Sequence, residues 1–323
     1  MADPDWEIPP DERPDPDEYG YDLDRALRAV VGLKSRVPED AFTAAILGTE
    51  RIGSGVVIND KGLVLTIGYL ITEAESIWLT AHDGRAVPGD ALAYDHATGF
   101  GLVQPLGRLG LPHLNLAEPQ EGRIGDDAVA AAGGGRSRAR RTTIIAREEF
   151  AGYWEYLLDE ALFTAPAHPL WSGAALISST GTLLGIGSLI LQRDTGRNKV
   201  DLNMFVPSWH LRPILSDLTR FGRVDKPARP WIGITAVESA DAIFVGGISE
   251  SGPADEAGIQ PGDRIVAVGD TEIEDLPTLW RSIWQHGPAG VSIPLTLARK
   301  SRTYTVTVTS ADRTARFTTP KLH

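Results

Sequence analysis

Ser172 is the residue whose type and setting point most directly to covalent chemistry. It lies in the run HPLWSGAAL, which spans residues 168–176. A serine hydroxyl becomes a useful nucleophile only when a neighbouring base accepts its proton and a third group orients that base. His168 lies four positions upstream and His96 lies in an earlier segment, so the sequence offers two imidazoles for this role. The pKa of imidazole, about 6.5, suits a base at neutral pH.

The composition argues against several other kinds of chemistry. The chain of 323 residues contains no cysteine, and its 7 histidines are scattered without the spacing of a metal site. We therefore expect no disulfide, thiolate nucleophile, metal site or cofactor. A net charge of −12 argues against a general nucleic-acid partner. The 42% apolar and 23% charged residues are typical of a globular protein, and the length allows two or three domains.

Three runs upstream of Ser172 extend the pattern: GSGVVI at residues 53–58, TIGYLI at 66–71 and YDHATGFGLV at 94–103. Together with the serine run they resemble trypsin-like serine proteases of the HtrA/Deg type, whose nucleophile loop reads NPGNSGGPL. The resemblance covers roughly residues 52–215 and implies two six-stranded β-barrels. Short apolar runs separated by turn residues, between residues 41 and 191, favour the same closed β-architecture.

The residues expected to activate Ser172 differ from those of the family. Tyr69 stands where the resemblance places the catalytic histidine, and Gly99 stands where it places the catalytic aspartate. A phenol with a pKa near 10 is protonated at neutral pH and cannot take the proton of the serine. Gly99 has no side chain with which to orient a base. The family resemblance therefore predicts a nucleophile position without its base or orienting group.

The oxyanion region differs as well. Leu170 and Trp171 replace the Gly and Asn that precede the serine in the family, whereas Gly173 after the serine is retained. A Cβ at position 170 restricts the backbone that would turn an N–H toward the reacting carbonyl. We expect a proteolytically inactive, pseudoprotease-like chain. The alternative is an active serine endopeptidase that uses Ser172 with His168 or His96 as a non-standard base.

The last third of the chain resembles a PDZ domain of the HtrA type. The strongest match is SGPADEAGIQPGDRI at residues 251–265, beside the family pattern SPAAxAGLxxGDxI. The predicted organisation is mainly β, a trypsin-like double six-stranded β-barrel followed by this PDZ domain. The expected segments are an acidic, proline-rich tail at 1–22, the barrel domain at 23–222, a linker at 223–230, the PDZ domain at 231–310 and a C-terminal tail at 311–323.

The start of the predicted PDZ domain is a candidate peptide-binding site. Backbone N–H groups of such a loop can bind a peptide's terminal carboxylate while the peptide adds a strand to the sheet. The candidate loop residues are Trp231, Ile232, Gly233 and Ile234, with Arg229 ahead of them to favour an anionic end, and with Leu279, Ser282 and Ile283 to line the side-chain pocket. The alternative is a PDZ domain that serves only as an internal brace.

The acidic segment at residues 1–22 is interpreted as a solvated leader. The alternative is an oligomer arm, because the resembling family forms trimers through N-terminal aromatic residues and this tail contains Trp6, Tyr19 and Tyr21. Apolar spacing predicts a short helix over 23–33. An arginine segment, Arg136, Arg138, Arg140 and Arg141, is interpreted as a solvated loop, with an anion dock for the acidic tail as the alternative.

These features together predict a degenerate HtrA-like protein that binds peptide C-termini or unfolded segments and acts as a scaffold, chaperone or regulator in protein quality control. A second alternative is a purely structural oligomer component. We expect a homo-oligomer, a trimer by the resemblance, without nucleic-acid binding or membrane insertion. The first residues lack the pattern of a signal peptide. The expected location is cytoplasmic if Met1 is the native start and periplasmic if a leader was removed.

Overall fold

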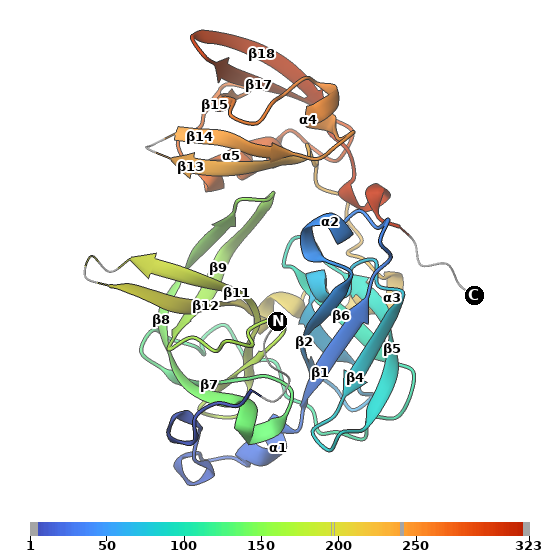
Figure 1. The fold of residues 1–323 in the computed structure, drawn as a ribbon, viewed down its shortest axis with the longest axis vertical. Helices are drawn as coiled ribbons and strands as arrows, with labels where there is room; N and C mark the ends of the chain where they lie inside the picture. Colours follow the sequence, from blue (N-terminus) through green and yellow to red (C-terminus); the bar gives the residue numbers. More distant parts are fainter. Residues whose placement is uncertain (1–5, 195, 197, 240–241, 319–323) are drawn as a thin grey trace. The chain divides into compact units, whose positions relative to one another are not determined.

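A computed structural model describes residues 6–194, 196, 198–239 and 242–318. The chain divides into two compact units. Unit 1 contains Met1–Glu148, Glu160–Val224 and Thr318–His323, and unit 2 contains Glu149–Asp159 and Asp225–Phe317. Both are built mainly from strands (Figure 1). The predicted class, a trypsin-like double β-barrel followed by a PDZ domain, is confirmed.

The first closed barrel of unit 1 has the strand order β1-β2-β3-β6-β5-β4. Its strands are β1 (Val30–Arg36), β2 (Glu50–Val57), β3 (Val64–Ile67), β4 (Ser76–Thr80), β5 (Ala86–Tyr94) and β6 (Phe100–Pro105). The turn between β2 and β3 forms because the Asn59 carboxamide accepts the N–H groups of Lys61 and Leu63, both at 3.0 Å. Gly62 there adopts φ +83°, a conformation that glycine supplies without strain.

The second closed barrel of unit 1 has the order β10-β11-β12-β9-β8-β7. Its strands are β7 (Asp127–Ala131), β8 (Ala139–Gly152), β9 (Tyr156–Ala165), β10 (Ala175–Ser178), β11 (Leu183–Asp194) and β12 (Lys199–Pro207). Leu162, Leu176, Leu184 and Phe205 form part of its buried core. Unit 1 also contains the short helices α2 (Ala44–Leu47) and α3 (Leu215–Phe221).

Unit 2 contains a sheet with strand order β13-β14-β15-β17-β18, in which β16 pairs with β15. Its elements are β13 (Ile234–Ser239), β14 (Ala242–Ile248), α4 (Pro253–Glu256), β15 (Arg264–Val268), β16 (Thr271–Glu272), α5 (Leu276–Gln285), β17 (Ser292–Arg299) and β18 (Arg302–Thr309). The Asp275 carboxylate caps α5 by accepting the Thr278 N–H at 2.7 Å. Asp263 before β15 is fully buried, and its carboxylate binds Arg299 through two bonds of 2.6 and 2.7 Å.

The contact units differ from the predicted segments at several places, and residues 225–230 of the expected linker belong to unit 2. The tip of the β8–β9 hairpin, Glu149–Asp159, belongs to unit 2, although we expected it in the barrel domain. The beginning of the expected C-terminal tail also belongs to unit 2, where Ala311 exchanges two backbone hydrogen bonds with Trp231, at 3.0 and 2.9 Å. These segments therefore extend the PDZ domain beyond residues 231–310.

The described part of the N-terminal segment is not a solvated leader, so that interpretation is wrong. Ile8 is buried, and its N–H donates to the Ser137 carbonyl at 2.8 Å. The carboxylate of Glu12 pairs with Arg140 at 2.7 Å. The same segment pairs Glu18 with Arg141 at 3.4 Å. Opposite charges thus dock the acidic segment on the arginine segment, as the alternative interpretation anticipated.

The predicted helix over 23–33 is shorter in the structure. Helix α1 spans Leu23–Leu27, where the Asp22 carboxylate caps it by accepting the Arg25 N–H at 2.8 Å. The β-branched pair Val30 and Val31 instead begins β1 and pairs with β2. Valine packs well on a pleated surface, so tertiary pairing overrides the helical spacing.

Two features are absent from the residues that the structure describes. None of the helices within those residues has the length and apolar character needed to cross a membrane. Over the same ranges, no cluster of three or more His, Cys, Asp or Glu side chains is arranged to hold a metal ion.

Candidate active site and carboxylate-binding loop

Ser172 lies in the loop between β9 and β10, and Tyr69 reaches it from the other barrel of unit 1. Tyr69 lies in a single helical turn, Gly68–Leu70, directly after β3. Its hydroxyl oxygen lies 2.9 Å from Ser172 Oγ and 2.9 Å from the Ser188 carbonyl oxygen. Within the described residues, the hydrogen-bonding side chain at Ser172 is therefore a phenol and not an imidazole. The sequence placed these two residues at one site, and the structure brings them together.

This phenol is a poor proton acceptor. Burial raises the pKa of Tyr69 to about 12, although hydrogen bonds with Ser172 and Trp171 oppose the rise. Tyr69 therefore stays protonated at neutral pH and has one proton to donate. When it donates to the Ser188 carbonyl, which can only accept, the Ser172 hydroxyl donates to a neutral phenol oxygen. Such an oxygen does not remove the serine proton.

His168 is fully engaged elsewhere. Its imidazole is buried, with Nε2 3.0 Å from the Arg138 carbonyl and Nδ1 accepting the Leu170 N–H at 3.0 Å. Burial lowers the pKa of His168 to about 4, so the ring is neutral. Asn203 further fixes the backbone here by accepting the His168 N–H at 2.5 Å. In this structure both ring nitrogens of His168 therefore contact backbone groups and not Ser172.

The same contact affects the oxyanion region. The Leu170 N–H, which the family resemblance would aim at a reacting carbonyl, donates to the His168 ring instead. The Gly173 N–H donates to the Gly187 carbonyl at 2.8 Å. Gly173 adopts φ +71°, and a Cβ there would lie 1.9 Å from the Ser54 carbonyl oxygen, so only glycine fits. A Cβ at Gly187 would lie 2.0 Å from the Trp171 carbonyl oxygen, so position 187 also requires glycine.

Gly99 belongs to a turn next to the Tyr69 segment. It adopts φ +80°, its N–H donates to the Asp95 carbonyl at 2.8 Å and its carbonyl accepts the Gly68 N–H at 2.7 Å. The Asp95 carboxylate is used within this turn, where it accepts the Thr98 N–H at 2.8 Å. The neighbouring imidazole of His96 packs on Tyr94, with ring centroids 4.1 Å apart. The turn therefore supports the Tyr69 backbone through Gly68.

A buried ion network, which the sequence did not indicate, holds the Tyr69 segment in place. The guanidinium of Arg51 donates to the carbonyls of Tyr69 and Thr72, at 2.7 and 3.0 Å. It also donates to the Thr43 hydroxyl at 2.7 Å, and that hydroxyl donates to the Glu73 carboxylate at 2.6 Å. Arg51 and Glu73 are both buried. A charged pair far apart in the sequence gives no local pattern, so only the fold reveals it.

The candidate carboxylate-binding loop of unit 2 holds a carboxylate from its own chain. The N–H groups of Ile232, Gly233 and Ile234 point at the Glu155 side chain, with shortest N···O distances of 3.2, 2.8 and 3.4 Å. The fourth predicted residue, Trp231, donates its N–H to Ala311. Glu155 was absent from the sequence prediction because nothing in the β8–β9 turn identifies a ligand for a loop some 80 residues away.

The remaining predicted peptide contacts fall into two groups. Leu279, Ser282 and Ile283 are buried on α5, and the two apolar residues belong to the same core cluster as Leu157 from the hairpin tip. Arg229 was expected to favour an anionic end, but the structure places its guanidinium 4.3 Å from the centre of the Trp284 ring.

The positive charge that acts on Glu155 comes instead from Arg313. Burial raises the pKa of Glu155 to about 7, against the opposing effects of the Gly233 and Ile232 N–H groups and of Arg313.

Comparison with known proteins agrees with both halves of the fold. The sequence-family model of the trypsin-like peptidase domain matches residues 53–186, and that of the PDZ domain matches residues 230–309. The periplasmic pH-dependent serine endoprotease DegQ of Escherichia coli (strain K12) is 28% identical over 293 residues, which are 84% of this chain and 63% of DegQ. The serine endoprotease DegS of Salmonella typhimurium (strain 14028s / SGSC 2262) is 27% identical over 311 residues, 91% of this chain and 86% of DegS.

Solved structures show the same architecture. A serine endoprotease from Yersinia pestis has a TM-score of 0.56 and 25% sequence identity, with 95% of this chain and 99% of that chain covered. The HtrA-type protease AlgW with decapeptide has a TM-score of 0.54 at 20% identity, covering 90% and 97% of the two chains, and shows the fold alone.

A trypsin-like peptidase domain followed by a PDZ domain defines the class of this protein. The two domain models, the relatives DegQ and DegS, and the solved structures together support an HtrA-type serine protease fold with a C-terminal PDZ domain. It spans less than two thirds of the length of DegQ.

Proposed function

We propose that this chain is an HtrA-family protein without protease activity, which acts through its PDZ domain as a scaffold, chaperone or regulator. The observation that supports this proposal most directly is the 2.9 Å contact between the Tyr69 phenol and Ser172 Oγ. General-base catalysis needs an acceptor of suitable pKa within hydrogen-bond reach of the nucleophile. A neutral phenol with a pKa of about 12 does not meet that need.

The oxyanion region supports the same proposal independently. Loss of one oxyanion-hole donor lowers kcat by about 10²–10³ in serine proteases. Here the Leu170 N–H is held by the His168 ring, so restoring a base alone would leave the transition state without that donor. The proposed partners are peptide C-termini or unfolded segments, with a carboxylate bound by the N–H groups of Ile232, Gly233 and Ile234. We further propose a homo-oligomer, by analogy with the family.

Labelling with a fluorophosphonate probe tests the catalytic part of this proposal, because the probe reacts with an activated serine. We expect no more labelling of the wild-type protein than of Ser172→Ala, and no cleavage of casein by either. An active HtrA-type protease treated in parallel shows that the probe and substrate work. Labelling of the wild-type protein that disappears in Ser172→Ala would refute the proposal.

That last result would support the second candidate, an active serine endopeptidase. The names of DegQ and DegS, both serine endoproteases, favour this candidate. It requires Tyr69 to leave Ser172 and another group to replace it. A crystal structure of the labelled protein would then identify the base.

A further inference from the structure

The hairpin tip at residues 152–155 lies along β13 in the manner of a bound peptide. The Ala236 N–H donates to the Tyr153 carbonyl at 2.7 Å, and Trp154 forms an antiparallel bridge with Thr235. We propose that this tip is an internal ligand of the PDZ groove, in which the Glu155 side chain stands in for a peptide's C-terminal carboxylate. An external peptide must then displace the tip. This inference rests on the proposed peptide-binding function and deepens it by naming the regulation of that site.

The carboxylate contact matches what a peptide terminus would make. A PDZ loop binds a terminal carboxylate through successive backbone N–H groups, while the peptide backbone pairs with the adjacent strand. Both features are present here, because Glu155 accepts from Ile232, Gly233 and Ile234, and Tyr153, two residues before it, pairs with β13. The carboxylate contact of Glu155 and the strand pairing of Tyr153 thus belong to one continuous segment.

Three further contacts within unit 2 hold the tip. The indole Nε1–H of the buried Trp280 donates to the Gly152 carbonyl at 2.9 Å. Leu157 is 7% exposed and belongs to the apolar core of unit 2. The guanidinium of Arg281 on α5 pairs with Glu149 on β8, and with Asp159 on β9 at 2.8 Å. Backbone, apolar and ionic contacts therefore support the same placement.

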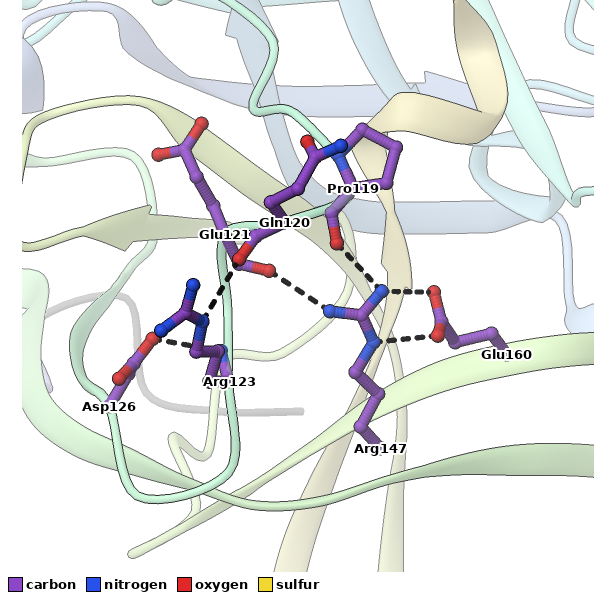
Figure 2. A network of polar contacts seen from close by, with 7 residues as sticks. All are labelled: Pro119, Gln120, Glu121, Arg123, Asp126, Arg147 and Glu160. Atoms are coloured by element: carbon purple, nitrogen blue, oxygen red, sulfur yellow. Dashed lines mark hydrogen bonds and ion pairs between the residues drawn. The ribbon is translucent and has the colours of Figure 1, made fainter.

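The base of the same hairpin is fixed separately, within unit 1. Figure 2 shows Arg147 on β8 bound to Glu160 on β9 through two bonds of 2.6 and 2.9 Å. The same guanidinium donates to the carbonyls of Pro119 and Glu121, at 2.8 and 3.1 Å. Release of the tip therefore leaves the base of the hairpin paired, and an exchange of ligands at the PDZ groove does not require the barrel strands to separate.

Hydrogen exchange measures the protection of the loop amides, and binding of a probe peptide measures whether the hairpin tip occupies the loop. Hydrogen exchange of the Ile232, Gly233 and Ile234 amides is followed in the full-length wild-type protein, in Glu155→Ala and in Glu155→Gln, which keeps the side chain's size. Glu238→Ala, an exposed carboxylate on β13, is the matched control. The probe peptide copies residues 150–154 and ends in one added leucine with a free carboxylate, and its amidated form is the ligand control.

We expect the three amides to exchange at least tenfold faster in Glu155→Ala, with a smaller effect in Glu155→Gln and none in the control. The probe peptide should bind Glu155→Ala at least tenfold more tightly than wild type, since a groove that is mostly occupied weakens apparent affinity. Unchanged exchange in both Glu155 variants would overturn the inference. Faster exchange without peptide binding would support the internal ligand and refute the peptide-binding function instead.

Discussion

The protonation of Glu155 should make release of the hairpin tip depend on pH. Its pKa is raised from 4.5 to about 7 in the docked state, so the docked tip binds a proton more tightly than the released tip. Docking is then strongest below pH about 4.5 and weakens as the pH rises through about 7. The charge of Arg313 opposes this rise in the pKa of Glu155.

The size of the effect follows from the same two pKa values. Linkage between pH 5 and pH 8 gives an opening equilibrium that increases about 70-fold, equivalent to about 2.5 kcal/mol. Protection factors of the Ile232, Gly233 and Ile234 amides, which correct for the intrinsic rise of exchange with pH, measure this directly. Glu155→Gln should remove the pH dependence. Protection that stays constant from pH 5 to pH 8, or a slope retained in Glu155→Gln, would refute the reasoning.

Three other perturbations test the remaining parts of the structure. Asp263→Asn should lower the urea midpoint of the PDZ unit, because it weakens the charged hydrogen bonds that the buried Asp263 accepts from the partly exposed Arg299; an unchanged midpoint would contradict this. Combining Tyr69→His with Gly99→Asp should not restore fluorophosphonate labelling, because the oxyanion donor stays engaged and position 99 needs φ +80°; recovered labelling would show otherwise. Arg140→Ala should expose the acidic segment to limited proteolysis, more so in high salt; equal cleavage rates would count against the docking contact.

The sequence predicted the fold well because its signals are local. Apolar runs between turn residues define the strands, and PGDRI at residues 261–265 marks a turn into β15 in which Asp263 is buried. The same local reasoning failed for Val30 and Val31, whose spacing suits a helix but whose pairing with β2 decides the outcome. Local pattern thus determines strands better than it determines the ends of elements.

The candidate site was predictable in part. Tyr69 and Ser172 were identified from motif positions, and their contact follows from the two barrels meeting as the resemblance implied. Arg51 and Glu155 were not identified, because each acts across a long sequence separation on backbone groups that carry no residue-type signal. Three of the four predicted loop residues, Ile232, Gly233 and Ile234, donate their N–H groups to Glu155, an acceptor that the sequence could not name.

Ser172 and the PDZ loop differ in which hydrogen bonds a ligand would have to replace. At Ser172, a working arrangement would require the Leu170 N–H to leave a buried imidazole that is bound at both ring nitrogens. A substrate carbonyl would accept the Leu170 N–H, but Nδ1 of His168 would lose its donor, which costs about 1–3 kcal/mol for a buried group left unpaired.

At the PDZ loop, by contrast, a peptide carboxylate offers the Ile232, Gly233 and Ile234 N–H groups the same acceptor that Glu155 offers now. The exchange leaves the same three N–H groups with a carboxyl acceptor, so its free energy depends on the remaining contacts of the peptide and on its concentration. We therefore expect ligands to act at the PDZ loop rather than at Ser172.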